Sequence, residues 1–193
     1  NHSPETLFDG VTFDPARLPV ALTREEVAAV LQHVHGVKRL VAALLYGSGL
    51  RLLESLQLRA KDVGFGSNEI VVRAGKGDRD RRTMLSVVLR DVLRRWIDAV
   101  HRQHERDLSA GAGWVALPRA LGRKYPNAGR AWGWQWVFPA TRTYVDVETG
   151  QHRRHHLHES VLQRAIREVG RMHTFRHSFA THLLEDGHDI RTI

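Results

Sequence analysis

The stretch from Val87 to Leu108 is the longest regular pattern in the sequence, and it restricts the fold most strongly. Apolar residues recur along it at helical spacing, at Val88, Val92, Leu93, Trp96 and Val100. The arginines of this stretch fall mostly outside that stripe: Arg90, Arg94, Arg95 and Arg102. The pattern predicts one long amphipathic helix with its apolar face against a core, in a chain that is mainly helical.

Shorter helices are expected before this one. Thr23-Arg24-Glu25-Glu26 reads as a capping box, and apolar residues follow it at helical spacing. A second helix is expected over about residues 37–46, ending at the Gly-Ser-Gly sequence of residues 47–49. A short helix that carries Arg51, Glu54 and Ser55 should come next.

The middle of the chain predicts one β-hairpin. Residues 69–73 are β-prone, residues 74–78 read as a turn, and residues 81–85 can return. Residues 109–137 are irregular and rich in glycine, proline and tryptophan, and residues 136–139 suggest a short buried strand or a packed turn. The fold class expected is α+β, mainly α, with a small antiparallel hairpin or sheet.

The last part of the chain is expected to be helical again. A polar, histidine-rich connection over residues 151–158 should lead into helices at about residues 157–169 and 174–185. Prolines at positions 4, 15 and 19 indicate a linker or tail over residues 1–18, followed by one domain over residues 19–193.

Composition excludes some classes of protein and favours others. The chain has 29 Lys and Arg against 21 Asp and Glu, no cysteine, and a sequence pI of about 10.7. No apolar run is long enough to cross a membrane, and no signal peptide is recognisable. The absence of cysteine fits a reducing cytoplasm. The basic charge, mostly arginine, favours a nucleic acid or another polyanion as partner, and a merely soluble basic surface is the alternative.

Three short fragments carry candidate chemistry. His173 and Arg176 are three apart near the start of the last helix, where a proton carrier beside a guanidinium group favours phosphate. Arg51 follows a glycine-rich break, and Glu54 three residues later can orient its guanidinium group. Lys76 lies between two glycines at the expected hairpin tip. Taken singly, each also fits an ordinary surface side chain.

Together, and in this order, the fragments resemble the tyrosine recombinases. The motifs are Gly-Ser-Gly-Leu-Arg-x-x-Glu over residues 47–54, Gly-Lys-Gly over 75–77, and His-x-x-Arg-His-Ser-Phe-Ala-Thr-His over 173–182. Residues 123–128, 132–139 and 153–160 resemble the integron integrases, in which an extra segment, here about residues 109–156, sits inside the catalytic domain. The resemblance covers nearly the whole chain from Pro19.

The resemblance implies a role for each matching residue. Arg51 and Arg176 would hold the non-bridging oxygens of the scissile phosphate, and Lys76 would protonate the leaving oxygen. His173 would bind the phosphate and assist proton transfer, while Glu54 would support Arg51 from behind. The chemistry would need no metal and no ATP, since the arginines supply the positive charge and a phosphotyrosine link conserves the phosphodiester energy.

The resemblance also implies DNA-binding residues in the extra segment, namely Lys124, Trp132, Trp134, His155 and His156. Integron integrases act on folded single-stranded cassette sites, where aromatic rings can stack on unpaired bases. The alternative is that the tryptophans simply pack this segment against the domain. A zinc site made by the histidines at positions 152, 155, 156 and 158, as in a metallohydrolase, is a weaker alternative.

In the family, the nucleophilic tyrosine follows the His-x-x-Arg helix. The three tyrosines here, Tyr46, Tyr125 and Tyr144, all precede that helix, and the link from Gly170 to His173 is shorter than the family's. We therefore expect a fragment that binds DNA weakly without cleaving it. The expected whole protein is a bacterial, nucleoid-associated cytoplasmic recombinase, four copies of which assemble on duplex or folded single-stranded DNA. A remnant protein that occupies recombination sites without cutting is the alternative.

Overall fold

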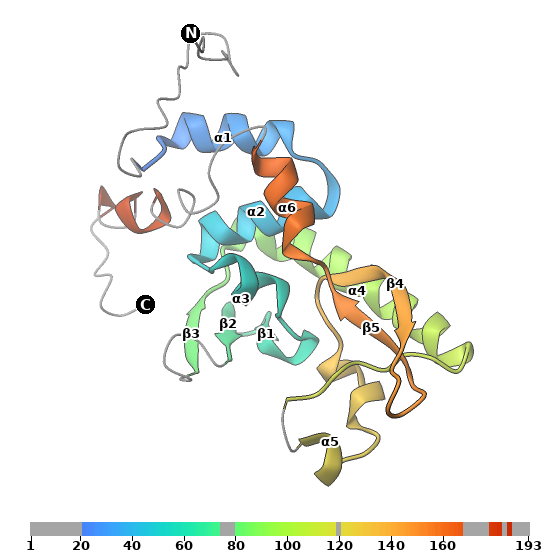
Figure 1. Cartoon of the computed structure of the whole chain (residues 1–193). Coiled ribbons are helices and arrows are strands. Elements are labelled where there is room, and N and C mark those ends of the chain that lie inside the picture. Colours follow the sequence, from blue (N-terminus) through green and yellow to red (C-terminus); the bar gives the residue numbers. More distant parts are fainter. Residues whose placement is uncertain (1–20, 74–79, 119–120, 168–177, 183–184, 187–193) are drawn as a thin grey trace, which may run out of the picture.

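The computed structural model of the chain describes residues 21–73, 80–118, 121–167, 178–182 and 185–186 (Figure 1). The named helices are α1 (Arg24–His33), α2 (Gly36–Ser48), α3 (Leu52–Leu56), α4 (Val87–Ser109), α5 (Leu121–Lys124), α6 (Glu159–Arg167) and the short 3-10 turns η1 (Ala60–Asp62), η2 (Ala128–Arg130) and η3 (Trp132–Trp134). The strands are β1 (Val63–Gly64), β2 (Glu69–Val72), β3 (Arg81–Met84), β4 (Pro139–Val145) and β5 (His152–His156). The expected tail over residues 1–18 lies outside the described residues.

The first three helices form where the sequence predicts them. The capping box at α1 is complete, since Thr23 Oγ1 accepts from Glu26 N–H and Glu26 Oε2 accepts from Thr23 N–H. Helix α2 ends at Gly49, whose left-handed backbone (φ 59°) turns the chain sharply toward α3. This turn brings Arg51 to the start of α3.

The β-hairpin over β2 and β3 is confirmed, and its antiparallel pairing aligns Ile70 with Thr83 and Val72 with Arg81. Strand β1 adds a third, short strand on the other side of β2. Thr83 Oγ1 donates a hydrogen bond to the Ser48 carbonyl at 2.7 Å, so the sheet is attached directly to the end of α2.

A second hairpin, β4–β5, was not expected. The prediction of a polar connection over residues 151–158 is wrong for residues 152–156, which form strand β5. Strand β5 pairs antiparallel with β4 in an exposed two-stranded sheet. Its sequence, His-Arg-Arg-His-His, lacks the apolar alternation that marks a half-buried strand, so the strand could not be predicted from the sequence pattern. The predicted helix after it is present as α6.

Helix α4 spans almost the predicted range, but its buried face differs from the predicted stripe. Leu93 and Val100 are buried as expected, and Trp96 packs against the core. Val88 and Val92 are 85% and 44% exposed, while Ile97 and His104 are buried in their place. The buried face is therefore rotated by part of a turn from the predicted stripe, and it runs through Leu93, Ile97, Val100 and His104.

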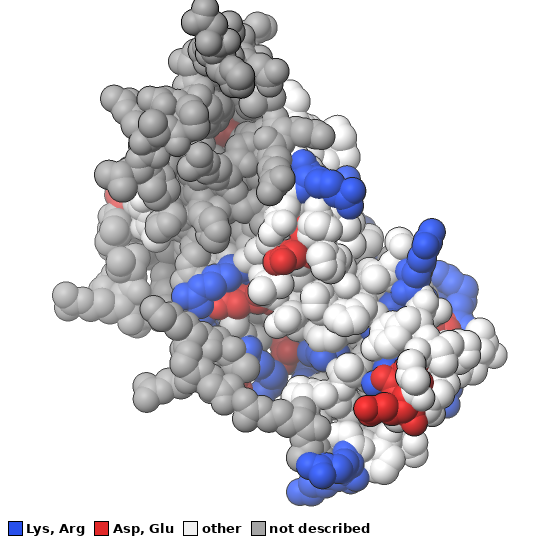
Figure 2. Space-filling model, in the orientation of Figure 1, with Lys and Arg blue, Asp and Glu red and all other residues white. Residues whose placement is uncertain are grey.

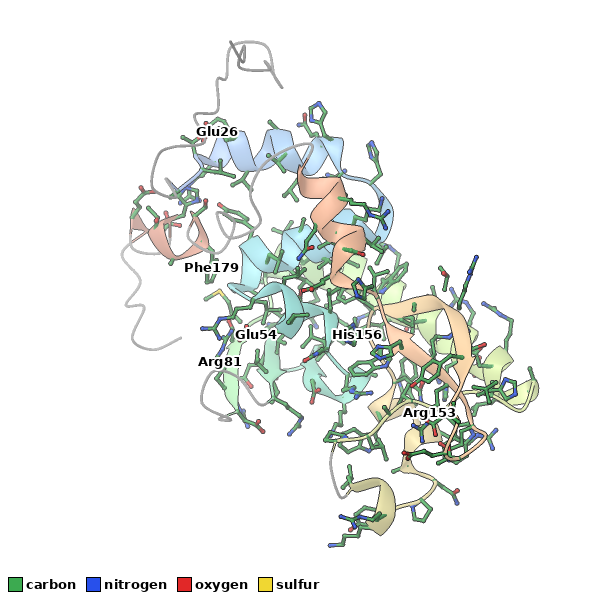
Figure 3. All side chains as sticks on the ribbon, in the orientation of Figure 1. Glu26, Glu54, Arg81, Arg153, His156 and Phe179 are labelled. Atoms are coloured by element: carbon green, nitrogen blue, oxygen red, sulfur yellow. The ribbon has the colours of Figure 1, made fainter. Side chains whose placement is uncertain are left out.

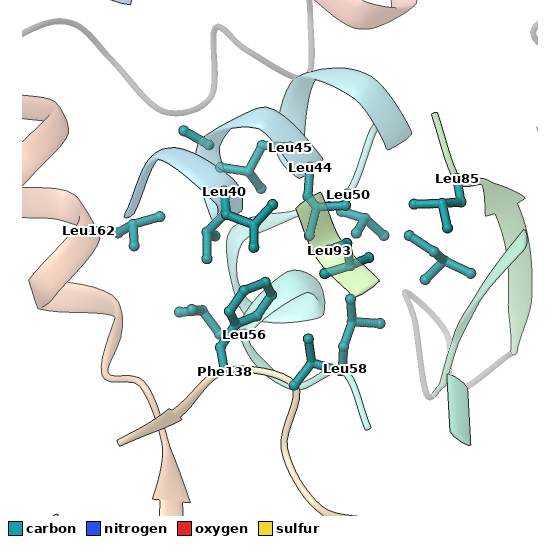
Figure 4. Close-up of a cluster of buried hydrophobic side chains, with 14 of the residues drawn as sticks. Leu40, Leu44, Leu45, Leu50, Leu56, Leu58, Leu85, Leu93, Phe138 and Leu162 are labelled. Carbon is teal, nitrogen blue, oxygen red and sulfur yellow. The ribbon is translucent and has the colours of Figure 1, made fainter. Parts of the chain in front are cut away.

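The core lies between α2, α3, α4 and α6 and consists mainly of leucines around Phe138 (Figure 4). In Figure 1 the three-stranded sheet lies below α2 and α3, whereas β4–β5 and α5 extend to the other side, below α4. Residues 136–138, which the sequence marks as a packed strand or turn, are buried in this core. Among the described helices, none has both the length and the apolar character needed to span a membrane.

Candidate nucleic-acid interface

Arg51 directly precedes helix α3, and Glu54 holds it in place. Glu54 Oε2 accepts a hydrogen bond from Arg51 N–H at 2.7 Å, and Glu54 Oε1 accepts from Arg51 Nη1 at 2.8 Å. The Arg51 side chain is 44% exposed, whereas that of Glu54 is 10% exposed. A nearly buried carboxylate thus binds the backbone N–H and one guanidinium nitrogen of Arg51. The other guanidinium donors still face solvent in a fixed direction.

Arg81, on strand β3, binds the same carboxylate. Its Nη2 donates to Glu54 Oε2 at 2.7 Å, and Figure 3 shows the two side chains meeting between α3 and β3. Sequence reasoning missed Arg81. The signal was the alternation along the strand, which puts Arg81 on the same face of the sheet as the buried Thr83.

Opposing effects set the charge state of Glu54. Burial raises the pKa of its carboxyl group, but the hydrogen bonds from Arg51 and the positive charge and hydrogen bond of Arg81 outweigh it. The pKa therefore lies below its ordinary value, and the group is an anion at neutral pH.

The turn before Arg51 is packed against the helical segment of residues 178–182. A Cβ atom on Gly49 would lie 2.5 Å from Phe179 Cε1, so only glycine fits there (Figure 3). In the same segment, Ser178 Oγ accepts a hydrogen bond from Leu22 N–H at 2.7 Å, and this bond is buried. The segment of residues 178–182 thus packs against the turn that leads to Arg51.

Three predicted site residues, Lys76, His173 and Arg176, lie outside the described residues. Arg73 and Asp80, which flank the hairpin tip, form an ion pair at 3.2 Å. Arg73 also donates to the buried Asp62 at 2.6 Å, which attaches this end of the hairpin to η1.

The predicted tryptophans of the extra segment differ in their surroundings. Trp132 packs against the core and its ring centroid lies 4.4 Å from that of His101. Trp134 has the Lys61 ammonium group 3.2 Å from its ring centroid, so a cation covers one face of the indole. Both tryptophans are partly buried, and the indole of Trp134 has a cation over one of its two faces.

Arg59 holds this segment to the domain, a role that no sequence motif predicts. Its guanidinium carbon lies 3.1 Å from the ring centroid of Trp136, and its nitrogens donate to the carbonyls of Trp134 and Ala116. Burial lowers the pKa of Arg59 to about 9, although the charge of Asp62 opposes this. Arg59 is 7% exposed, so it is a structural residue.

The predicted histidines lie on β5, next to other rings. His155 is exposed and its ring lies 6.0 Å from that of Tyr144 on β4, while the partly buried His156 contacts Trp136 edge-on at 5.1 Å. Burial, together with the neighbouring histidines, lowers the pKa of His155. Lys124 is exposed at the end of α5, away from these rings (Figure 1). The predicted DNA-binding residues therefore do not form one cluster.

The surface charges around these residues are mixed. On the face shown in Figure 2, Lys and Arg form several separate groups, and most have Asp or Glu beside them. Within the described part of the chain, no group of three or more His, Cys, Asp or Glu residues has the arrangement of a metal site.

Comparisons with known proteins agree on one family. The sequence pattern of the phage integrase family matches residues 21–193. A protein of Escherichia coli described as an integrase/recombinase is 45% identical over 186 residues, covering 92% of this chain and 55% of that protein. The tyrosine recombinase XerA of Thermococcus kodakarensis is 31% identical, covering 93% of this chain and 54% of that protein. The chain thus spans about half the length of these curated relatives.

Solved structures show the same fold. The crystal structure of XerA recombinase matches with a TM-score of 0.57 and 23% identity, over 93% of this chain and 55% of that one. The Tn1549 transposon integrase in complex with circular intermediate DNA matches with a TM-score of 0.58 and 17% identity, over 91% and 57%. The predicted fold class is confirmed, and the chain belongs to the phage integrase family of tyrosine recombinases.

Proposed function

We propose that this chain supplies the phosphate-binding site of a site-specific DNA recombinase that acts by phosphate transesterification. The observation that carries the proposal is the anchoring of Arg51, whose half-exposed guanidinium group is fixed by the nearly buried Glu54. A preorganised arginine stabilises the charge of a phosphoryl transition state without having to be ordered during the reaction.

The remaining roles in this proposal follow the family motif. Arg176 holds the phosphate together with Arg51, Lys76 protonates the leaving oxygen, and His173 assists proton transfer at the attacking hydroxyl group. The packing of Phe179 against Gly49 supports the proposal, because Phe179 is three residues after Arg176 in the sequence and contacts the turn that precedes Arg51. This chemistry needs no metal ion or nucleotide, since the two guanidinium groups supply the positive charge.

Binding of the chain to a fluorescent DNA duplex, measured by anisotropy over a range of salt, tests this role. We expect Arg51→Ala to weaken binding about tenfold and to lower the salt slope by roughly one, as loss of one phosphate contact does. Arg102→Ala, an equal loss of charge on the exposed face of α4, is the matched control. Equal effects of the two substitutions would remove the case for a phosphate site at Arg51.

We infer that none of the three tyrosines is the nucleophile of this reaction, so that this chain binds DNA without cleaving it. The Tyr46 hydroxyl group is hydrogen-bonded to His182 Nδ1 at 2.8 Å, and burial raises its pKa, opposed by the charge of Arg24. Tyr125 follows α5, and Tyr144 lies on β4, both in the extra segment. Incubation with nicked duplex DNA should give no SDS-resistant adduct; an adduct abolished by a Tyr→Phe substitution would contradict this inference.

We further propose that the sites are integron cassette sites, bound as folded single strands, and that the segment of about residues 109–156 reads them. The partly buried Trp134 and the exposed His155, with Tyr144 beside it, are residue types suited to stack on or bond to unpaired bases. In this proposal, four copies of the whole protein together hold the duplex or folded sites.

A comparison of a folded single-stranded cassette hairpin with a duplex of the same length tests the site preference. We expect tighter binding of the hairpin, and loss of that preference in Trp134→Ala and His155→Ala. His152→Ala, at the exposed far end of β5, serves as the control. Trp132→Ala is unsuitable because its ring is part of the domain packing. Equal binding of both DNAs would contradict the integron assignment.

A further inference from the structure

The carboxylate that orients Arg51 also works against its function. Glu54 is an anion hydrogen-bonded to the Arg51 guanidinium group at 2.8 Å. An arginine paired one to one with a carboxylate has no net charge, so its attraction for a phosphate group is largely cancelled. Orientation of Arg51 by Glu54 alone would therefore weaken the phosphate site that it organises.

Arg81 changes this balance. Its Nη2 lies 2.7 Å from Glu54 Oε2, so two guanidinium groups share one carboxylate and the three side chains together carry one positive charge. The Arg81 side chain is 26% exposed and that of Glu54 is 10% exposed. Solvent therefore screens this charge less than it screens the charges of the open surface.

The sheet holds Arg81 in its position. Strand β3 pairs with β2, and Thr83 Oγ1 donates to the Ser48 carbonyl, just before the turn that leads to Arg51. The neighbouring carboxylates have other partners, because Asp62 and Asp80 both pair with Arg73. Among the described residues, Arg81 therefore donates to the same carboxylate that binds Arg51, that of Glu54.

From this geometry we propose that Arg81 is a positioning residue of the phosphate site, whose charge compensates Glu54 so that Arg51 is oriented without being neutralised. The inference rests on the proposed function, and it adds a residue to that site. The inference differs from a purely structural role in what it predicts for DNA binding. The charge of residue 81 should matter more than its ability to donate a hydrogen bond.

Two substitutions at position 81 and one control at position 82 test this in the DNA-binding assay. Arg81→Gln keeps a donor for Glu54 but removes the charge, and we expect about tenfold weaker binding with a salt slope lower by roughly one. Arg81→Lys keeps the charge and should recover most of the affinity. Arg82→Gln is the matched control, since Arg82 is the next residue on the opposite face of β3, 73% exposed and paired with Glu69 at 3.0 Å.

A double-mutant cycle isolates the charge of Glu54. Glu54→Gln removes the negative charge that Arg81 compensates, so Arg81→Gln should cost much less affinity in that background than in the unsubstituted chain. Circular dichroism spectra and unfolding midpoints establish that each variant is folded. If Arg81→Gln fails to fold, Arg81→Lys carries the test, and it must bind with nearly full affinity.

The outcomes separate this inference from the proposed function. If the unsubstituted chain does not bind DNA, both are wrong. If Arg51→Ala weakens binding but Arg81→Gln binds as well as Arg81→Lys, the phosphate site stands and the compensating role of Arg81 is overturned. Equal losses from Arg81→Gln in both Glu54 backgrounds would overturn it as well.

Discussion

Gly49 and Gly36 share a left-handed backbone, with φ of 59° and 61°, but their surroundings differ. A Cβ atom on Gly49 would overlap the Phe179 ring, whereas nothing lies within 4 Å of the corresponding position on Gly36. Substitutions of the two glycines therefore separate the cost of backbone strain from the cost of a collision with the Phe179 ring next to the proposed phosphate site.

We predict that Gly49→Ala lowers the free energy of unfolding by about 2–4 kcal/mol, from strain plus overlap. Gly36→Ala should lower it by only about 1 kcal/mol, from strain alone. Urea denaturation measures both. Similar losses in the two variants would show that residues 178–182 do not press against the turn before Arg51.

At this scale the sequence predicts residues whose partners are near in the chain. Arg51 and Glu54 are three residues apart, so their contact follows from local geometry. Arg81 lies 27 residues from Glu54, and Arg59 lies 77 residues from Trp136. Their roles depend on how separate elements pack, which no local pattern in the sequence specifies.

At the scale of elements, helix α4 shows the limit of periodicity. Its length follows from the spacing of its apolar residues, but which of them are buried depends on the face that α4 turns toward α2. A Cβ atom on Gly47 of α2 would lie 3.2 Å from Leu89 Cδ1 and 3.3 Å from Ser86 Cβ, so α2 meets the start of α4 on the side of Leu89. Val88 thus remains in solvent although it fits the predicted stripe.

We predict that Leu93→Ala lowers the free energy of unfolding by about 2–4 kcal/mol, because it leaves a cavity in the core. Val88→Ser should change it by less than about 0.5 kcal/mol, because the side chain is 85% exposed. Chemical denaturation of the two variants checks this, and a large effect of Val88→Ser would show that α4 is rotated relative to the described packing.

The hairpin β4–β5 is attached to α4 by an ion pair between Arg154 and Asp107. Arg154 Nε and Nη2 donate to the two oxygens of Asp107 at 2.9 and 2.8 Å, and the side chains are only 11% and 18% exposed. Arg154 also donates to the carbonyls of Ala140 and Thr141 on β4. One arginine therefore joins both strands of the hairpin to the helix.

We predict that Asp107→Asn lowers the free energy of unfolding by about 3 kcal/mol, because it leaves a nearly buried guanidinium group without its anion. Hydrogen exchange should speed up over residues 139–156 but not over α2. The control is Arg82→Ala, which breaks an exposed pair and should cost less than about 1 kcal/mol. Unchanged exchange in the hairpin would show that Arg154 does not hold it to α4.

At the scale of the whole molecule, His104 lies where α4 meets the extra segment. Its Nε2 is 2.9 Å from the Arg130 carbonyl and its ring faces Trp132, so the bonded nitrogen carries the proton and donates. Burial lowers the pKa of His104, although the hydrogen bond to Arg130 opposes this. Among the described residues, no partner bonds to its buried Nδ1.

This gives a prediction for the stability of the whole domain. The unfolded chain takes up a proton at His104 near pH 6.5, and the folded chain only at lower pH. The contribution of neutral His104 is thus fully present above pH 6.5 and is lost as the pH falls through the folded pKa. Unfolding at about pH 7.5 and 5.5 should show a smaller loss of stability for His104→Gln than for the unsubstituted chain.

The bonds between Leu22 and Ser178 and between Arg24 and Asp186 join the two ends of the described fold. More than 150 residues separate the partners in each case. During synthesis on the ribosome, the partners of Leu22 and Arg24 emerge only after the core helices have been made. The packing of Phe179 on Gly49 is equally late. A nascent chain therefore gains the contacts that hold the turn before Arg51 only when synthesis of the described fold is nearly complete.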